Sequence, residues 1–422
     1  MSRTEAIIRE TKRRTLSLLH NVEYRTESFR LKAILDNYDP SVCSLKKPER
    51  IRTVTFIITR MVRFHGGQTS ILHLGTELEK LGIKVCYLSC KEQSKEEAEF
   101  CCGANLPGYK GRVFPINRYL AAIEKGKIKA PDVVVASSWD TVFFAKRFEN
   151  SYKMYFVQDY EPFFYTFGEE YLMCRNTYLQ GLHMVSLGDW NREMILKEFG
   201  AVEDGKKTTV KDTAGEEREL KIDTVSFPYD SSGYEKFERD FESYRDKKKI
   251  TIAVYLKYYG KRLPDLIPYM LVNTAEKLKS SGTELEVLYF GEAKTFTPKG
   301  GRNLGQLNRQ ELNDLYRKAD FGMVASMSNI SLVPYEMHAA GLPVIEFEDG
   351  SYPYFFGKET ALFTRIGDKD IAGLLKEATE IPERLKEMDE KAYEVLKDLN
   401  WERTGREFFD ILKSVTGSDP DA

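Results

Sequence analysis

The sequence lacks the long apolar stretches that mark membrane and exported proteins. It contains no run of about twenty apolar residues, so it predicts no membrane span. The N-terminus, Met-Ser-Arg-Thr-Glu, has no apolar signal core, so we expect a cytoplasmic protein. An excess of basic charge is also missing, because 63 Lys and Arg stand against 65 Asp and Glu. Proteins that bind nucleic acid are usually basic, so this balance disfavours nucleic acid as a partner.

Metal and disulfide patterns are missing as well. The six cysteines form no Cys-x-x-Cys pair, Cys101 and Cys102 are adjacent, and the five histidines follow no zinc spacing. Reduced thiols are the ordinary state of such cysteines in the cytoplasm. We therefore expect neither a disulfide framework nor a structural zinc site.

The sequence does contain enough apolar material for two cores. A chain of 422 residues is too long for one hydrophobic core, and 42% of its residues are hydrophobic. Two stretches of alternating strand and helix patterns, 51–230 and 250–398, are joined by a hydrophilic linker, 231–249. We therefore expect an α/β protein with two Rossmann-like, doubly wound domains that face a cleft.

Residues 1–50 form an extension with mixed charge. The apolar spacing within Thr4–His20 predicts a helix, and we expect the extension to be helical and to pack on the first domain. The basic cluster Lys12–Arg14 leaves an alternative, in which this helix lies on the inner face of the membrane as a peripheral contact.

The first domain opens with a pattern that is typical of a doubly wound sheet. A β-branched strand at Val54–Thr59 is followed by a loop with Gly66 and Gly67, then by a helix over about 69–81 and a strand over 84–89. The loop is not the Gly-x-Gly-x-x-Gly fingerprint, which disfavours a nicotinamide enzyme. Its glycines would let the backbone approach a ligand closely.

Polar residues follow two further strands of this domain. One strand, within Pro131–Ser138, ends in small polar residues, and the next, Met154–Pro162, ends in Asp159 and Glu161. Ligands bind at the carboxyl ends of such strands. The aromatic segment that follows, Phe163–Tyr178, suits the apolar faces of sugar rings, although a core aromatic cluster is the commoner fate of such residues.

The second domain carries features that suit an anion. Its first strand, Ile250–Tyr255, is followed by Lys257, Lys261 and Arg262. The later stretch Phe321–Ile345 predicts a strand, a polar loop, a short helix and another strand. The start of such a helix directs backbone N–H groups and the positive end of its dipole at a ligand, typically a phosphate.

That short helix has recognisable ends. Ser331 is a good N-cap, Pro334 fits the first turn, and Gly341 is a natural stop. Glu336, one turn in, could accept hydrogen bonds from sugar hydroxyls. The cations and the helix start together suit the diphosphate of a nucleotide-sugar. The alternative is an ordinary strand-helix-strand unit whose loop binds nothing.

These motifs resemble those of a known family. The pattern Ser328-x7-Glu336, followed by His338–Ile345, resembles the E-x7-E region of retaining glycosyltransferase family 4, which has the GT-B fold. Other segments resemble motifs of that family: Gly66-Gly67, Lys257 with Arg262, Leu304–Leu307, and Leu399–Trp401, which opens the C-terminal helix 399–417. In the family, this last helix crosses back to the first domain.

A second set of motifs resembles a narrower group. The block Phe156–Tyr165, with Tyr178-x-x-Gly181 and Gly188–Trp190, is similar to the WsaF-like rhamnosyltransferases, which extend bacterial rhamnose-containing glycans. The chain departs from the wider family at Ser328, where the family has Glu. It also has Lys257 where Arg is usual, and a lysine cannot fork onto phosphate as an arginine can. Which of Lys261 and Arg262 faces the diphosphate is open.

The resemblance implies a role for each matching residue. Three residues would be catalytic: Lys257, Arg262 and Asp159. The donor would contact Lys261, Gly291, Leu307, Ser328, Asn329, Ile330, Ser331 and Glu336. The acceptor would contact Gly66, Gly67, Tyr160, Glu161 and Trp190.

The function that the resemblance implies is retaining, metal-independent transfer of a sugar. The expected donor is dTDP-L-rhamnose, and the expected acceptor is a glycan or lipid-linked glycan of a growing bacterial cell-surface polysaccharide. Two kinds of alternative stay open. The first is another enzyme of the same fold, either a transferase that uses a UDP or GDP sugar or a sugar-nucleotide epimerase. The second is a non-catalytic subunit that binds glycan. The absence of Glu at position 328 supports the non-catalytic subunit, whereas the cations after the first strand of the second domain argue against it. The sequence leaves the oligomeric state open.

Overall fold

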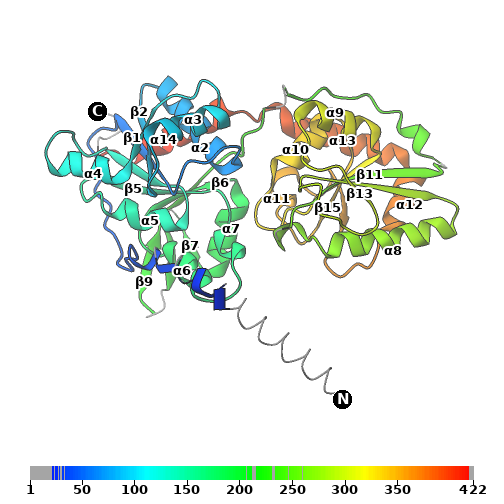
Figure 1. Ribbon diagram of the computed structural model, residues 1–422, viewed down its shortest axis with the longest axis horizontal. Coiled ribbons are helices and arrows are strands. Elements are labelled where there is room, and N and C mark those ends of the chain that lie inside the picture. The colour runs from blue at the N-terminus through cyan, green and yellow to red at the C-terminus, as the bar shows by residue number, and fades with distance from the viewer. Residues whose placement is uncertain are drawn as a thin grey trace, which may run out of the picture.

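The computed structural model describes residues 21–22, 24–26, 28, 31–32, 34–205, 207–211, 215–230, 233–245, 247–258 and 260–417. The expected helix Thr4–His20 and its basic cluster lie outside the described residues. Figure 1 shows two domains side by side, each built on its own sheet. In the described part of the chain, no helix has the length and apolarity needed to cross a membrane.

The sheet of the first domain has seven parallel strands in the order β10-β6-β5-β4-β1-β2-β3. The central strands of this sheet are almost fully buried, which explains why they appear in the sequence as continuous β-branched and aromatic runs. The strands are β1 (Thr53–Ile58), β2 (Lys84–Ser89), β3 (Arg112–Pro115), β4 (Val133–Ala136), β5 (Tyr152–Val157), β6 (His183–Leu187) and β10 (Ile222–Val225). The order reverses between β1 and β4, which creates a crevice at their carboxyl ends.

Helices connect these strands, and a small antiparallel sheet projects from the domain. The helices are α2 (Gly66–Lys80), α3 (Lys95–Asn105), α4 (Ile116–Glu124), α5 (Trp139–Lys146), α6 (Glu169–Thr177) and α7 (Asp189–Glu198), with a 3-10 turn at Glu161–Phe164. The small sheet contains β7 (Val202–Asp204), β8 (Lys207–Lys211) and β9 (Glu217–Leu220).

One expectation about the first domain is wrong. Gly66 and Gly67 do not lie in a loop but form the first turn of α2, because His65 caps the helix earlier than the apolar spacing indicated. The Nδ1 atom of His65 accepts a hydrogen bond from the backbone of Gln68 at 3.3 Å. This cap satisfies one of the free N–H groups at the helix start and extends the helix over both glycines.

The second domain has six parallel strands in the order β13-β12-β11-β14-β15-β16. These are β11 (Lys249–Tyr255), β12 (Glu284–Phe290), β13 (Arg302–Asn303), β14 (Phe321–Met323), β15 (Val344–Phe347) and β16 (Leu362–Thr364). Its helices are α8 (Leu266–Ser280), α9 (Arg309–Lys318), α10 (Leu332–Ala339), α11 (Pro353–Phe356), α12 (Ala372–Glu380) and α13 (Pro382–Lys397). Pro382 separates α12 from α13, because proline begins a helix readily but cannot continue one.

The last helix, α14 (Trp401–Ser414), leaves the second domain and packs on α2 of the first, as Figure 1 shows. Phe408 and Leu412 are fully buried in the core of the first domain. Trp401 stacks on His73 with 4.5 Å between ring centroids. The two Rossmann-like domains that the sequence predicted are therefore confirmed, and α14 joins them.

Part of the N-terminal extension packs on the first domain. Tyr38 meets Phe143 edge to face at 5.2 Å, and Ile34 packs in the same cluster. The buried Nζ of Lys146 donates to the carbonyl oxygens of Asp39 and Ser41, at 2.5 Å each. These contacts fix residues 34–41 beside α5.

Candidate functional site

The loop between β14 and α10 is held in shape from behind. The Oγ atom of Ser326 donates to the carboxylate of Glu346 at 2.5 Å, and the backbone N–H of Ser351 donates to the carbonyl of Ser326 at 2.7 Å. Burial raises the pKa of Glu346 to about 7, although the hydrogen bond from Ser326 opposes that rise. The loop is therefore fixed before any ligand arrives.

The start of α10 has a hydroxyl without a partner. Ser331 occupies the N-cap position with extended backbone, but its side chain does not cap the helix. Its Oγ atom is buried and has no hydrogen-bond partner among the described residues. The free N–H groups of the first turn and this hydroxyl can serve an anion instead. At the other end Gly341 has φ +70°, the left-handed backbone that the sequence predicted for a stop.

The cations after β11 take different positions. Arg262 is buried, donates from Nη1 to the carbonyl of Ala325 at 2.6 Å, and lies over the ring of Tyr255. The ammonium of Lys261 lies 4.3 Å from the ring centroid of Phe164 and 3.6 Å from Oδ1 of Asp159. Burial lowers the pKa of Lys261; Asp159 opposes this shift, and Arg262 adds to it. An anion beside both cations would relieve their mutual repulsion.

Lys261 and Arg262 line a cavity of about 880 Å³ between the two domains. The same cavity is lined by seven further residues that the sequence singled out: Gly66, Gly67, Asp159, Asn329, Ile330, Ser331 and Glu336. Lys257, which we expected to pair with Arg262, lies outside this cavity, near the carboxylate of Glu292. Lys261, in the 3-10 turn Gly260–Arg262, stands beside Arg262 in the lining instead.

Glu336 lies in a ring of polar side chains on the wall of this cavity. The hydroxyl of Tyr316 donates to its Oε2 atom at 3.4 Å. Burial raises the pKa of Glu336, while hydrogen bonds from Tyr234 and Tyr316 and the charge of Arg309 act in the opposite direction. The sequence did not single out Arg309 or Tyr234, because nothing marks the first residue of α9 or one linker tyrosine as a neighbour of α10.

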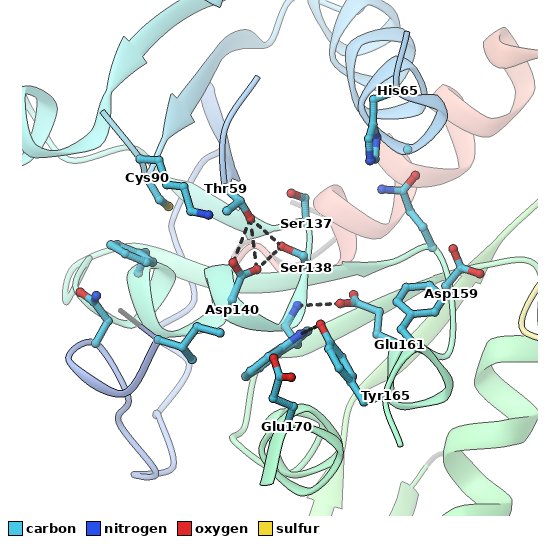
Figure 2. Close-up of a pocket in the computed structure, with 18 of the residues that line it drawn as sticks. Thr59, His65, Cys90, Ser137, Ser138, Asp140, Asp159, Glu161, Tyr165 and Glu170 are labelled. Atoms are coloured by element: carbon cyan, nitrogen blue, oxygen red, sulfur yellow. Dashed lines mark hydrogen bonds between the residues drawn. The ribbon is translucent and has the colours of Figure 1, made fainter. Parts of the chain in front are cut away.

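A second cavity, of about 1010 Å³, lies at the crevice where the strand order of the first sheet reverses (Figure 2). It is lined by residues that follow β1, β2, β4 and β5, which is where such sheets bind ligands. Thr59, Ser138 and Asp140 form a hydrogen-bonded group there. The Asp140 carboxylate accepts from Thr59 Oγ1 at 3.0 Å and from Ser138 Oγ at 2.5 Å.

Glu161 forms part of the wall of the second cavity. Its Oε1 accepts from the hydroxyl of Tyr155 at 2.5 Å, and its Oε2 accepts from the backbone N–H of Trp139 at 3.0 Å. Burial raises the pKa of Glu161 to about 8, although both hydrogen bonds oppose that rise. The indole of Trp139 in turn donates to the hydroxyl of Tyr165 at 2.8 Å, which fixes both rings (Figure 2).

The two cavities meet where the domains touch. Four residues line both of them: Gly67, Gln158, Asp159 and Lys261. At this junction Ser328 donates from Oγ to Oδ1 of Asp159 at 3.0 Å, and the side-chain amide of Asn329 donates to the carbonyl of Gln158. Ser328 is itself buried and lines neither cavity.

Several expected contact residues lie elsewhere. Tyr160 is fully buried and stacks on Tyr178, and Trp190 is buried against Phe163, so both rings lie in the core and line neither cavity. Gly291 and Leu307 line neither cavity. The left-handed φ of Gly291, +104°, and a Cβ position only 2.5 Å from the ring of Tyr255 explain that glycine without a ligand.

Within the described residues, no three His, Cys, Asp or Glu side chains are grouped so that they could hold a metal ion. The site offers two adjacent cations and a helix start on one side, and carboxylates with aromatic rings on the other.

Neither a family model nor a curated protein matches the sequence. Solved structures do match it. HepE from Anabaena, in complex with UDP and glucose, has a TM-score of 0.60 at 9% identity, over 86% of this chain and 100% of its own. The pneumococcal O-GlcNAc transferase GtfA, in complex with UDP and GlcNAc, gives 0.57 at 10% identity, over 87% and 100%. A glycosyltransferase from Rickettsia africae gives 0.58 at 11% identity, over 88% and 100%. At such low sequence identity, structural similarity shows the fold alone. The chain has the GT-B fold, with two Rossmann-like domains and a cleft between them.

Proposed function

We propose that the protein is a glycosyltransferase, which takes a nucleotide-sugar into the cavity between the domains and an acceptor into the cavity of the first domain. The observation that carries this proposal is the junction of the two cavities at Asp159 and Lys261. A sugar held at the inner end of one cavity would meet a hydroxyl held in the other. The two reactants would then be oriented for transfer.

The donor side has the chemistry that a nucleoside diphosphate requires. Lys261 and Arg262 supply positive charge, and the start of α10 supplies N–H groups and the Ser331 hydroxyl. These groups can stabilise the charge that develops on the departing diphosphate, as a metal ion does in other enzymes. Glu336 lies on the same wall and can accept hydrogen bonds from ribose hydroxyls. In a retaining, front-face reaction, the departing phosphate itself can accept the proton of the acceptor.

For the sugar, we propose L-rhamnose from dTDP-L-rhamnose, transferred onto a bacterial cell-surface polysaccharide. The motifs that resemble WsaF-like enzymes support this choice, as does Ser328 in place of Glu. A UDP-sugar is the competing donor, because HepE and GtfA were both solved with UDP. Thermal stabilisation by dTDP, UDP and GDP sugars separates the two, since a ligand at a hundred times its Kd adds about 2.7 kcal/mol to the free energy of unfolding. Stabilisation by UDP sugars alone would exclude the rhamnose donor.

Two lysines of the segment that follows β11 test the donor side. Lys261→Ala should slow sugar transfer about a hundredfold or more, because it removes a cation beside the leaving diphosphate. Lys257→Ala is the matched variant and should keep near-normal activity, since Lys257 lies outside both cavities. Rates are measured with purified proteins whose unfolding temperatures have been compared. Near-normal transfer by Lys261→Ala, or a loss confined to Lys257→Ala, would contradict the assignment.

A further inference from the structure

We propose that the cavity of the first domain binds an uncharged sugar ring and rejects anionic sugars, so that the acceptor residue is neutral. This inference deepens the proposed function and rests on it, because that function is what makes the bound sugar the acceptor. The binding preference itself follows from the residues that line the cavity (Figure 2).

The position of the cavity would ordinarily suit a phosphate. It lies at the reversal point of a parallel sheet, beside the start of α5, where backbone N–H groups commonly hold an anion. In this protein, carboxylate side chains already occupy the start of α5, where an anion would bind. The N–H of Trp139 is bonded to Glu161, and Asp140 lies in the first turn of α5. A phosphate or carboxylate of a ligand would find this helix start occupied.

The charge of the lining also opposes an anion. Among the described residues, five carboxylates line the cavity, those of Glu92, Asp140, Asp159, Glu161 and Glu170, against two lysines, Lys91 and Lys261. Lys261 lies beside Asp159 and lines both cavities. Burial raises the pKa of Glu161 to about 8, and with Glu161 neutral the carboxylates still outnumber the lysines. Burial lowers the pKa of His65, which disfavours its charged form.

The remaining walls suit a sugar ring. The rings of Phe144, Phe164 and Tyr165 offer apolar surface, and Phe164 is 45% exposed. Carboxylates accept hydrogen bonds but donate none, so they match the hydroxyls of a neutral sugar and not a second carboxylate. Ile34 and Asn37 of the N-terminal segment line the same cavity. Aromatic faces and acceptor oxygens together define a polyhydroxylated, uncharged ligand.

The direct test measures binding of simple glycosides to the full-length protein without donor. The probes are methyl glycosides of glucose, galactose, mannose and N-acetylglucosamine, with the methyl glucuronide, the methyl galacturonide and the 6-phosphates as anionic partners. Methyl rhamnoside, which has no 6-hydroxyl, is paired with its 4-phosphate. Saturation-transfer NMR should show binding of at least one neutral glycoside. Its anionic partner should bind about tenfold more weakly, as one repelled charge implies.

Two pairs of variants place the binding in this cavity. Glu92→Gln, at an exposed carboxylate of the lining, should reduce the discrimination against anionic probes, whereas Glu96→Gln, an exposed glutamate outside the lining, should not. Phe164→Ala should weaken binding of the neutral glycoside about fivefold or more, within the range for loss of one aromatic contact. Phe167→Ala, 81% exposed and outside the cavity, should leave it unchanged.

The outcomes divide clearly. Binding of no neutral probe, equal binding of anionic partners, or an equal loss in Phe164→Ala and Phe167→Ala would each overturn the inference. Failure of the proposed function would appear differently, as glycoside binding that persists while no nucleotide-sugar binds and no transfer occurs.

Discussion

At the scale of single residues, Glu161 shows how a buried carboxylate shapes a binding site. It is 7% exposed, accepts two hydrogen bonds and fixes the start of α5 on the wall of the second cavity. Burial raises its pKa to about 8 from an ordinary 4.5. The folded protein therefore keeps this proton over a pH range in which the unfolded chain has lost it.

The pH dependence of stability follows with a definite sign. As the pH rises from about 4.5 to about 8, Glu161 should lower the free energy of unfolding by up to about 1.4 kcal/mol per pH unit, with no contribution below that window. Glu161→Gln mimics the protonated form, so its stability should fall less over this window. Urea unfolding at intervals from pH 5 to pH 9 measures the difference.

An exposed neighbour provides the control for that experiment. Glu169→Gln, in the first turn of α6, should keep the pH dependence of the unchanged protein. If Glu161→Gln and Glu169→Gln gave the same slope, Glu161 would not be the protonated group.

At the scale of elements, the first turn of α2 contains glycines that the fold does not require. Neither Gly66 nor Gly67 has left-handed backbone, and a Cβ atom on Gly67 would make only ordinary contacts at 3.5 Å with Gln158 and His65. Glycine usually weakens a helix, by about 1 kcal/mol relative to alanine in its interior. Gly67 lines both cavities, and this position suggests another reason for glycine here, which is that a ligand approaches the backbone closely.

Gly67→Ala separates these reasons. We expect its unfolding temperature to stay the same or rise, because alanine favours the helix. Its transfer rate should fall about tenfold or more, because the added methyl group would occupy space that the ligand needs. Gly103→Ala in α3 is the matched control, with no neighbour within 4 Å of the added Cβ and no position in either cavity. Full activity in Gly67→Ala would show that no ligand approaches this turn.

At the scale of the whole molecule, the two domains touch through a carboxylate that the first domain supplies. Ser328, where the family that the sequence resembles has Glu, donates to Asp159 across the cleft. A second carboxylate at position 328 would therefore lie against Asp159 and also near the pair formed with Lys261. Like charges at such short separation repel, most strongly where water is excluded.

Ser328→Glu should open the cleft. We expect a larger radius of gyration by small-angle X-ray scattering and slower transfer than in the unchanged protein. Ser328→Gln has nearly the same size without the charge and controls for steric disturbance of a buried site. Equal effects of the two variants would attribute the change to size, and no effect of Ser328→Glu would argue against the contact between Ser328 and Asp159 in solution.

Local patterns were sufficient for much of this architecture. The β-branched runs of β1 and β11, Gly341 after α10 and the amphipathic α14 depend on the periodicity and backbone preferences of adjacent residues, which a sequence displays directly. The start of α2 was missed because its cap is a histidine, and histidine is not a usual N-cap.

The sequence by itself determined two parallel α/β domains, because strands buried on both faces and helices with one apolar face can pack in few other ways. It also placed small polar and acidic residues at the ends of β4 and β5. Only the tertiary structure decided that Lys261 rather than Lys257 stands with Arg262, that Tyr160 and Trp190 lie in the core, and that Asp159 meets Ser328. These outcomes depend on where separate elements meet in space, and spacing along the chain does not encode that position.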